Sequence, residues 1–273
     1  MAERADVVAA FLAAHGWGDA ERRPLAGDAS FRRYERLTRG DERAVLMDAA
    51  PNAEDVRPFV RMARHLKGLG LSAPEIIARD EAAGLVLEED LGDDTYTRVL
   101  ASGGDEDALY ATAVDLLIDL HRRGDAVPAG LPAYGNGRLL DEAFLLPRWY
   151  LPAMEGRPVS ETARRSYGEA WLSLFPTVHA RPRTLVLRDY HVDNLMVLPG
   201  RRGIAACGLL DFQDAVAGPA AYDLMSLLED ARRDLEPGLI EDMLGRYRAA
   251  FRTWTGTRSR PPTPSSPPSA TPR

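Results

Sequence analysis

The sequence predicts an α+β protein of two lobes, with a small β-rich N-terminal lobe and a larger, mostly helical C-terminal lobe. The first observation is a β-hairpin pattern, with strands over 31–37 and 43–48 around the turn Arg39-Gly40-Asp41. The second is an apolar run over 85–87 that leads into an acidic turn at Gly92, which we interpret as the crossing point between two structural units. The third is the helical spacing of apolar residues that dominates the chain beyond this point.

The N-terminal lobe is expected to span residues 1–91. Apolar residues recur at helical spacing over 4–15, up to Gly16, and predict a first helix before the hairpin. After the hairpin, residues 53–69 predict an amphipathic helix with arginines on its polar side. A short apolar run over 71–79, interrupted by a proline, predicts another strand before the crossing point.

The C-terminal lobe is expected to span residues 92–254. Its predicted helices cover 108–123, 161–179, 220–228 and 239–251. Short apolar strands are expected before Asp189, after Asn194 and up to Asp211, whereas residues 131–159, rich in Pro, Gly and aromatic residues, are predicted to be irregular. The final residues 255–273 are a low-complexity Pro/Ser/Thr tail that cannot offset its ordering entropy by burial, and we expect it to be disordered.

Composition excludes several classes of function. The chain has 273 residues, 45% of them hydrophobic, which is enough for a sizeable core. Acidic residues outnumber basic ones, 41 to 34, so no positive field attracts nucleic acid or an anionic membrane, and neither is an expected partner. The single cysteine, Cys207, lies in A-A-C-G-L-L and is predicted to be a buried strand residue.

No targeting or membrane-spanning segment is expected. The opening M-A-E-R-A-D places acids where a signal peptide carries only positive charge. No apolar run approaches the roughly 20 residues that a membrane helix needs. A cytoplasmic location follows as the expectation, while the oligomeric state is left undetermined.

Three polar residues follow or flank apolar runs in the C-terminal lobe. Asp189 ends the run T-L-V-L-R-D, Asn194 comes five residues later, and Asp211 ends G-L-L-D. Phosphoryl transfer needs a carboxylate that holds the acceptor hydroxyl, together with oxygen ligands for a divalent cation. The pattern therefore predicts Asp189 as the base and Asn194 and Asp211 as Mg²⁺ ligands, the alternative being ordinary turn and strand-end residues.

A second candidate site precedes the hairpin. The small-residue loop that contains Gly27, Asp28 and Ser30 can bring backbone N–H groups close to phosphates, and the hydroxyl of Ser30 can add a donor. An ordinary turn is the alternative for this loop.

These motifs resemble a known family. The stretches R-D-Y-H-V-D-N-L (188–195) and L-L-D-F-Q-D-A-V-A-G-P-A-A-Y-D-L (209–224) resemble the catalytic loop and metal-binding segment of the aminoglycoside phosphotransferase-like kinases. The resemblance extends over nearly the whole chain up to about Phe251. It implies a two-lobed protein-kinase-like fold, ATP and Mg²⁺ as cofactors and a structural role for Asp223. It also implies a nucleotide-binding hinge that contains Glu88 and Asp90.

In detail, G-D-A-S-F-R-R-Y, V-L-M-D-A and D-V-R-P-F look most like the bacterial anomeric kinases of cell-wall recycling. Those enzymes phosphorylate the C1 hydroxyl of N-acetylmuramate and N-acetylglucosamine, so the resemblance implies a small-molecule sugar as the acceptor. The alternatives are an aminoglycoside kinase, a choline- or homoserine-type kinase, and a catalytically weak kinase-like binding protein.

The chain departs from the family pattern in three places. The family's His-x-Asp is Leu187-Arg188-Asp189 here, so the usual histidine is absent. Met47 stands where the family has a strand lysine that binds nucleotide phosphates, and we hypothesise that Arg32 or Arg33 supplies the missing charge, the alternative being that both face solvent. The tail replaces helices with which the family continues, through a shifted reading frame or shortening, and we expect it to leave apolar surface uncovered.

The residues that bind the acceptor are the least defined. A sugar needs polar groups and often an aromatic platform, and two segments of the C-terminal lobe are the richest in such residues. The candidates are Arg148, Trp149, Tyr150, Glu229 and Asp230. A packing cluster and a solvated helix face are the alternatives.

Overall fold

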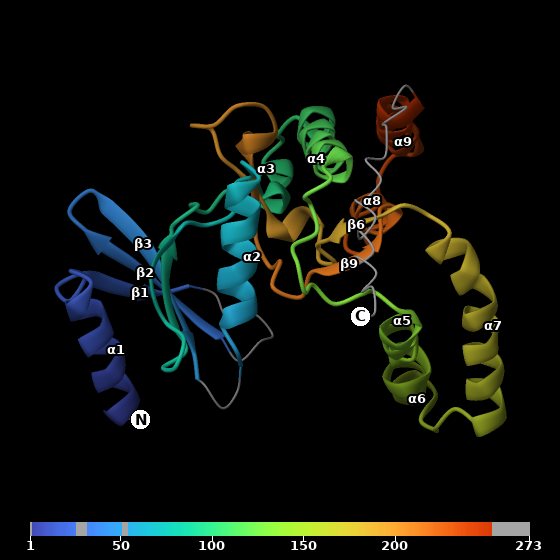
Figure 1. The fold of residues 1–273 in the computed structure, drawn as a ribbon, viewed down its shortest axis with the longest axis horizontal. Helices are drawn as coiled ribbons and strands as arrows, with labels where there is room; N and C mark the ends of the chain where they lie inside the picture. The colour runs from blue at the N-terminus through green and yellow to red at the C-terminus, as the bar shows by residue number, and fades with distance from the viewer. Residues whose placement is uncertain (1, 26–31, 51–53, 253–273) are drawn as a thin grey trace, which may run out of the picture.

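A five-stranded antiparallel sheet forms the N-terminal part of the computed structural model, which describes residues 2–25, 32–50 and 54–252 (Figure 1). Its strands are β1 (Glu21–Pro24), β2 (Arg32–Arg39), β3 (Glu42–Ala49), β4 (Ile76–Asp80) and β5 (Leu85–Glu89). They are ordered β1-β2-β3-β5-β4. The predicted hairpin is confirmed as β2 and β3, in which Arg39 pairs with Glu42 at the turn.

Two helices cover the two faces of this sheet. Helix α1 (Ala2–Ala14) packs its apolar side against one face, where Leu37, Leu46 and Leu85 are buried. Helix α2 (Arg57–Gly68) covers the other face and buries the alternate residues of the same strands. Successive side chains of a strand point to opposite faces, so each central strand supplies both layers of the core.

The C-terminal part is mainly helical. Its helices are α3 (Tyr96–Ala101), α4 (Glu106–Arg122), α5 (Asn136–Ala143), a π-helix (Leu146–Tyr150), α6 (Leu151–Glu155), α7 (Glu161–His179), α8 (Ala221–Leu228) and α9 (Pro237–Arg252). Helix α4 is central and packs against α8 and α9, whereas α5, α6 and α7 extend away from the rest of the molecule (Figure 1). No helix in the described part of the chain is long and apolar enough to cross a membrane.

Two short antiparallel strand pairs hold the polar residues predicted from the sequence. Strand β6 (Arg183–Val186) pairs with β9 (Val216–Pro219), and β7 (Leu195–Val197) pairs with β8 (Cys207–Leu209). Cys207 is fully buried in β8, as predicted. The amide of Leu209 donates to the carbonyl of Ser72 at 2.8 Å, and this bond joins the second pair to the segment between α2 and β4.

The structure corrects some of the predicted elements. Residues 131–159 are not irregular, because they contain α5, the π-helix and α6. Pro147 and Pro152 lie in the first turns of their helices, where a missing N–H costs nothing, so these prolines start helices instead of breaking them. Helix α2 begins at Arg57 and not at residue 53, again with a proline in its first turn.

The short elements β1, α3 and β9 are among those that were not predicted. Strand β1 has the sequence Glu-Arg-Arg-Pro, is exposed along its whole length and pairs with β2, so it carries no apolar signal. Strand β9 ends in Gly-Pro, which reads as a turn in the sequence. The predicted tail, 255–273, lies outside the described residues.

The close contact of β7 and β8 predicts a steric requirement at Gly208. A Cβ atom there would lie 2.9 Å from the Cβ of Met196 and 3.0 Å from the Cδ1 of Leu198. Because the Met196 Cβ is attached directly to the backbone of β7, it cannot move aside, and Gly208→Ala should destabilise the protein by about 1–3 kcal/mol in urea unfolding.

Gly68 provides the matched control, because a Cβ at the end of α2 meets nothing within 4 Å. Gly68→Ala should leave stability unchanged or raise it by up to about 1 kcal/mol. Equal effects of the two substitutions would contradict the packing argument.

Candidate active site

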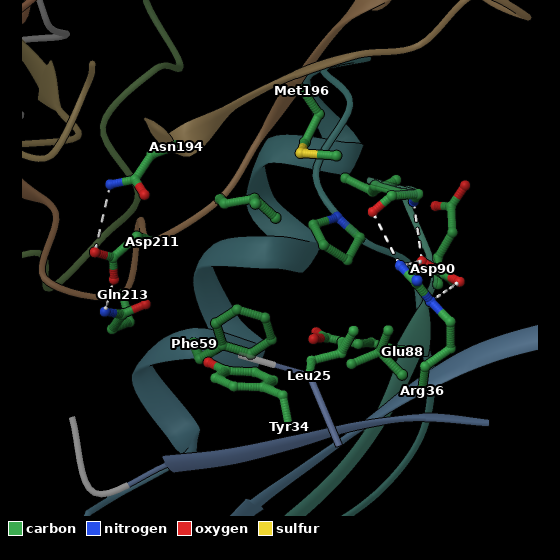
Figure 2. A pocket seen from close by; sticks show the side chains of 16 residues that line it. Leu25, Tyr34, Arg36, Phe59, Glu88, Asp90, Asn194, Met196, Asp211 and Gln213 are labelled. Atoms are coloured by element: carbon green, nitrogen blue, oxygen red, sulfur yellow. Dashed lines mark hydrogen bonds and ion pairs between the residues drawn. The ribbon is translucent and has the colours of Figure 1, made fainter. Parts of the chain in front are cut away.

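A cavity of about 280 Å³ lies between the sheet and the β7–β8 pair. Its lining is Leu25, Tyr34, Arg36, Val45, Phe59, Pro74, Glu88, Glu89, Asp90, Leu91, Gly92, Asn194, Met196, Leu210, Asp211 and Gln213. Figure 2 shows Asn194, Asp211 and Gln213 at one end and Asp90 with Arg36 at the other. Asn194 and Asp211, two of the three residues predicted to carry the chemistry, therefore line a cavity whose opposite wall is the five-stranded sheet.

The register of β2 decides which of its side chains reach this wall. Arg32, Tyr34 and Arg36 share one face of the strand, because side chains alternate, and Tyr34 and Arg36 line the cavity. Arg32 is buried, with 6% of its surface exposed, and pairs with Glu54. Arg33 is exposed on the opposite face. Of the two arginines named in our hypothesis, Arg32 thus lies on the side of the cavity.

Met47 is fully buried in the core between its strand neighbours Tyr34 and Val86. No ammonium group therefore enters from this position of β3. The adjacent strand instead carries the buried Arg32 on the cavity face, one strand away from the position that the family pattern assigns to lysine.

The segment after β5 is fixed by Arg36. Its Nε lies 2.7 Å from Asp90 Oδ2, and its Nη1 donates to Asp93 Oδ1 at 2.9 Å. The carboxylate of Asp90 is thereby occupied by a residue of the sheet. Glu88, the other predicted hinge residue, lies inside the cavity with 6% of its surface exposed. Burial raises the pKa of Glu88 to about 8.

Asp189, Asn194 and Asp211 come together through backbone and amide contacts. The Asn194 amide Nδ2 donates to the carbonyl of Asp189 at 3.0 Å and lies 3.5 Å from Asp211 Oδ2. Burial, and then the charge of Asp211, raise the pKa of Asp189. The cluster joins the loop after β6, the short 3₁₀ turn Val192–Asn194 and the loop after β8.

The oxygen atoms of this cluster fit a hard divalent cation. Since Nδ2 of Asn194 is used by the backbone, its Oδ1 is the atom left for a ligand. Gln213 donates its amide N–H to Asp211 Oδ1, while its own Oε1 is buried and has no partner among the described residues. Carboxylate and amide oxygens are the donors that Mg²⁺ accepts.

The Asp223 carboxylate holds the backbone directly before Asp189 in place. This carboxylate accepts the N–H of Leu187 at 2.7 Å and of Arg188 at 2.9 Å, and only 1% of the Asp223 surface is exposed. Burial raises the pKa of Asp223 to about 7, although the hydrogen bonds from the two N–H groups lower it by favouring the ionised form. Arg188 has a left-handed φ of 74°, and its guanidinium donates to Glu142 at 2.8 Å.

The candidate acceptor residues do not gather in one place. Arg148, Trp149 and Tyr150 are exposed on the π-helix, with 68% of the Trp149 surface accessible. Glu229 is exposed, and Asp230 is buried and accepts the backbone N–H of Arg232 at 3.0 Å. None of the five lines the cavity. Their contact with an acceptor stays a prediction.

The predicted phosphate-binding residues Gly27, Asp28 and Ser30 lie outside the described residues. Sequence reasoning missed Tyr34, Phe59 and Gln213 as cavity residues. Alternation along β2 puts Tyr34 on the same face as Arg32, but it does not tell which face of the strand borders the cavity. Gln213 lies two residues after Asp211, inside the stretch that resembles the metal-binding segment, and this signal was available. Phe59 reaches the cavity through the packing of α2, which no local pattern reveals.

The two hydrogen bonds to Asp223 predict a specific cost of substitution. An asparagine there can accept only one of the two N–H groups and turns an amide donor toward the other. A buried donor without a partner costs about 1–3 kcal/mol, so Asp223→Asn should lower the free energy of unfolding by that amount.

The exposed Asp214 is the control for this experiment, and Asp214→Asn should change stability by less than about 0.5 kcal/mol. An equally small loss in Asp223→Asn, measured by urea unfolding, would show that the loop is held by other contacts.

Comparison with known proteins agrees with this geometry. The chain is 37% identical to the N-acetylmuramate/N-acetylglucosamine kinase of Caulobacter vibrioides, in an alignment that covers 91% of this chain and 77% of that protein. It is 39% identical to the enzyme of the same name from Pseudomonas aeruginosa, over 89% of this chain and 70% of that one.

Solved structures share the fold at low sequence identity. An ADP-bound aminoglycoside phosphotransferase, APH(2'')-Ib, matches with a TM-score of 0.64 and 16% identity, over 92% of this chain and 83% of that one. A choline kinase from Streptococcus pneumoniae matches with a TM-score of 0.65 and 13% identity, over 90% and 80%. These likenesses show the two-lobed kinase-like fold. Residues 21–259 match the family described as the phosphotransferase enzyme family, and the chain belongs to it.

Proposed function

We propose that this protein is an ATP- and Mg²⁺-dependent kinase that phosphorylates the anomeric C1 hydroxyl of N-acetylmuramate and N-acetylglucosamine, as in peptidoglycan recycling. The observation that carries the proposal is the agreement of four relatives, 34–39% identical, that are all named N-acetylmuramate/N-acetylglucosamine kinase. The meeting of Asp189, Asn194 and Asp211 beside the cavity supports a phosphotransfer site in this chain.

Asp189 is the proposed base. Its carboxylate orients the C1 hydroxyl of the sugar toward the γ-phosphoryl group and accepts the proton of this hydroxyl. The bond between the sugar oxygen and the γ-phosphorus forms as the bond from the γ-phosphorus to the β–γ bridging oxygen breaks and ADP leaves. Asp223 positions the base through the N–H groups of Leu187 and Arg188.

Asn194 and Asp211 are the proposed ligands of Mg²⁺, with the unpartnered Oε1 of Gln213 close to them. The cation, when bound, neutralises charge on the nucleotide phosphates. The Asn194 amide keeps the loop closed through its bond to the Asp189 carbonyl, so the same side chain both shapes the loop and faces the ligand site.

Arg32 is the proposed substitute for the missing strand lysine. It is buried on the cavity face of the sheet, and Glu54 pairs with it from the segment that precedes α2. An arginine presents several N–H donors in a plane and suits phosphate oxygens. Arg33, on the opposite face, cannot take this role without a change of register.

The alternatives have less support. The aminoglycoside and choline kinases are similar in fold alone, at 13–17% identity, and carry no argument about this acceptor. A catalytically weak binding protein would carry Asp189, Asn194 and Asp211 without using them. The order of the loop argues against this, because the Asp223 carboxylate holds the backbone before Asp189 through two hydrogen bonds.

One prediction of the proposed function concerns Asp189, the proposed base. Wild-type protein with Mg²⁺ and ATP should phosphorylate both amino sugars, measured by ADP release, with no turnover of kanamycin or choline. Asp189→Asn should lower kcat by about 100-fold or more, because proton acceptance is lost. Asp141→Asn, an exposed carboxylate on α5, should not change kcat. Absence of turnover with either sugar in folded wild-type protein would refute the proposed reaction.

Another prediction of the proposed function concerns Arg32, the proposed phosphate-binding residue. Arg32→Met should raise KM for ATP by about 10-fold or more, which corresponds to a charged hydrogen bond of about 1.5–3 kcal/mol. Arg32→Lys should recover most of the loss. The neighbouring Arg33→Met is the matched control and should leave KM for ATP within about twofold. Equal KM values for ATP in both methionine variants would exclude Arg32 as the substitute.

A further inference from the structure

The side chain of Arg188 has no role in the proposed phosphotransfer, although it directly precedes the proposed base. Its guanidinium Nη2 donates to Glu142 Oε1 at 2.8 Å, and 21% of the side chain is exposed. Its Nε is buried and has no hydrogen-bond partner among the described residues. The guanidinium group therefore has donor atoms beyond the one that Glu142 uses.

Arg188 is held in place from α5. Glu142, near the end of this helix, accepts from Arg188 through one carboxylate oxygen and from the hydroxyl group of Tyr134 through the other. Tyr134 is itself buried, and its backbone N–H donates to the carbonyl of Ala217 in β9 at 2.9 Å. A side chain that is fixed in advance loses little entropy when it binds a ligand, so this guanidinium group is preorganised for an anion.

The charges around the proposed base show why a cation is needed there. Burial and the charge of Asp211 raise the pKa of Asp189, whereas the charge of Arg188 lowers it. His191 lowers it too, but its ring is buried and its Nε2 contacts the Asn194 amide. The two aspartates repel an acceptor that brings a negative charge to the base, and the partly exposed guanidinium group of Arg188 can offset this repulsion.

The two proposed sugars differ in charge. N-Acetylmuramate carries a lactyl ether at C3 that ends in a carboxylate, whereas N-acetylglucosamine carries a hydroxyl group at the same carbon. Only one ring carbon separates C3 from C1. When the C1 hydroxyl lies at Asp189, the lactyl carboxylate is therefore within reach of a long side chain next to the base.

We infer that Arg188 binds the carboxylate of N-acetylmuramate and determines the preference of the site for the acidic sugar. The inference rests on the proposed function and names the residue that recognises the charged acceptor. A guanidinium group presents N–H donors in a plane that matches the two oxygens of a carboxylate. With the neutral sugar bound, Arg188 keeps its pairing with Glu142, so the cation is not left without a partner and both sugars are accepted.

A purely structural role for the pair of Arg188 and Glu142 makes a different prediction. If the pair only attached α5 to the loop before the base, the loss of either charge would weaken the turnover of all acceptors alike. In carboxylate recognition the two residues act in opposite directions, because Glu142 repels the anion and competes for the guanidinium group. Substitutions at the two positions should then shift the preference for the anion in opposite senses.

The test is the steady-state turnover of three acceptors by the full-length protein with Mg²⁺ and ATP, measured by ADP release. The acceptors are N-acetylmuramate, its carboxamide, which keeps the shape without the charge, and N-acetylglucosamine. For wild-type protein, kcat/KM should be at least about 10-fold higher for N-acetylmuramate than for the carboxamide, mainly through KM, as expected for a charge-assisted hydrogen bond. This ratio should fall as salt is added, because partly exposed charges are screened.

Four variants assign the preference to its residues. Arg188→Gln removes the charge and should bring the ratio of the two kcat/KM values close to one, whereas Arg188→Lys should recover part of the preference. Glu142→Gln keeps an oxygen acceptor for Arg188 and should raise the ratio about threefold or more above the wild-type value. Arg138→Gln, at an exposed arginine of α5, is the matched control and should leave the ratio unchanged.

Thermal unfolding without ligand verifies that each variant is folded. Should Arg188→Gln fail to fold, the lysine variant and the shift in Glu142→Gln decide the inference. Equal kcat/KM values of wild-type protein for N-acetylmuramate and its carboxamide would overturn it. An unchanged ratio in Arg188→Gln, or shifts of the same sign in the glutamine variants of Arg188 and Glu142, would do so too.

Failure of the proposed function has a different signature. Turnover of both natural sugars without discrimination between the carboxylate and the carboxamide would refute the role of Arg188 and leave the proposed reaction intact. Absence of turnover with every acceptor, in folded wild-type protein, would refute the proposed reaction and this inference with it.

Discussion

The two hydrogen bonds from the Asp223 carboxylate to the amides of Leu187 and Arg188 are the constraint on which the site depends. They fix the backbone directly before Asp189, at a point where the chain leaves β6 and Arg188 adopts a left-handed conformation. Because Asp223 belongs to α8, this helix and the β6–β9 pair form one unit beneath the loop. The Asn194 amide also donates to the carbonyl of Asp189, so the backbone of the proposed base is held both before and after it.

A second constraint is the register of the sheet. The pairing of β2, β3 and β5 puts Arg32, Tyr34, Arg36, Met47 and Glu88 on one face, and α2 covers that face only in part. The part of this face that α2 does not cover forms one wall of the cavity. A shift of one residue in β2 would exchange the buried Arg32 for Arg33 and move Tyr34 out of the cavity. The sheet therefore specifies the polar groups of the cavity as strictly as it specifies the core.

Much of this arrangement follows from local sequence patterns. The hairpin, the long helices and the strand ends at Asp189 and Asp211 could be predicted, because each has its own periodicity or turn signal. Residues 131–159 could not, since proline has the opposite meaning at a helix start and inside a helix. The choice between Arg32 and Arg33 was equally inaccessible. Alternation separates their faces, but only the packing of α2 decides which face borders the cavity.

The remaining feature is the position of backbone strain. Among the described residues, Arg188 and Asp211 are the two non-glycine residues with positive φ, at 74° and 54°. Each such conformation costs about 1–3 kcal/mol and persists only where surrounding contacts impose it. Asp223 imposes it on Arg188, and the Gln213 amide holds the Asp211 side chain. Arg188 lies two residues after the end of β6, and Asp211 lies two residues after the end of β8. The fold thus concentrates its strain directly before Asp189, the proposed base, and at Asp211, the proposed cation ligand that lines the cavity.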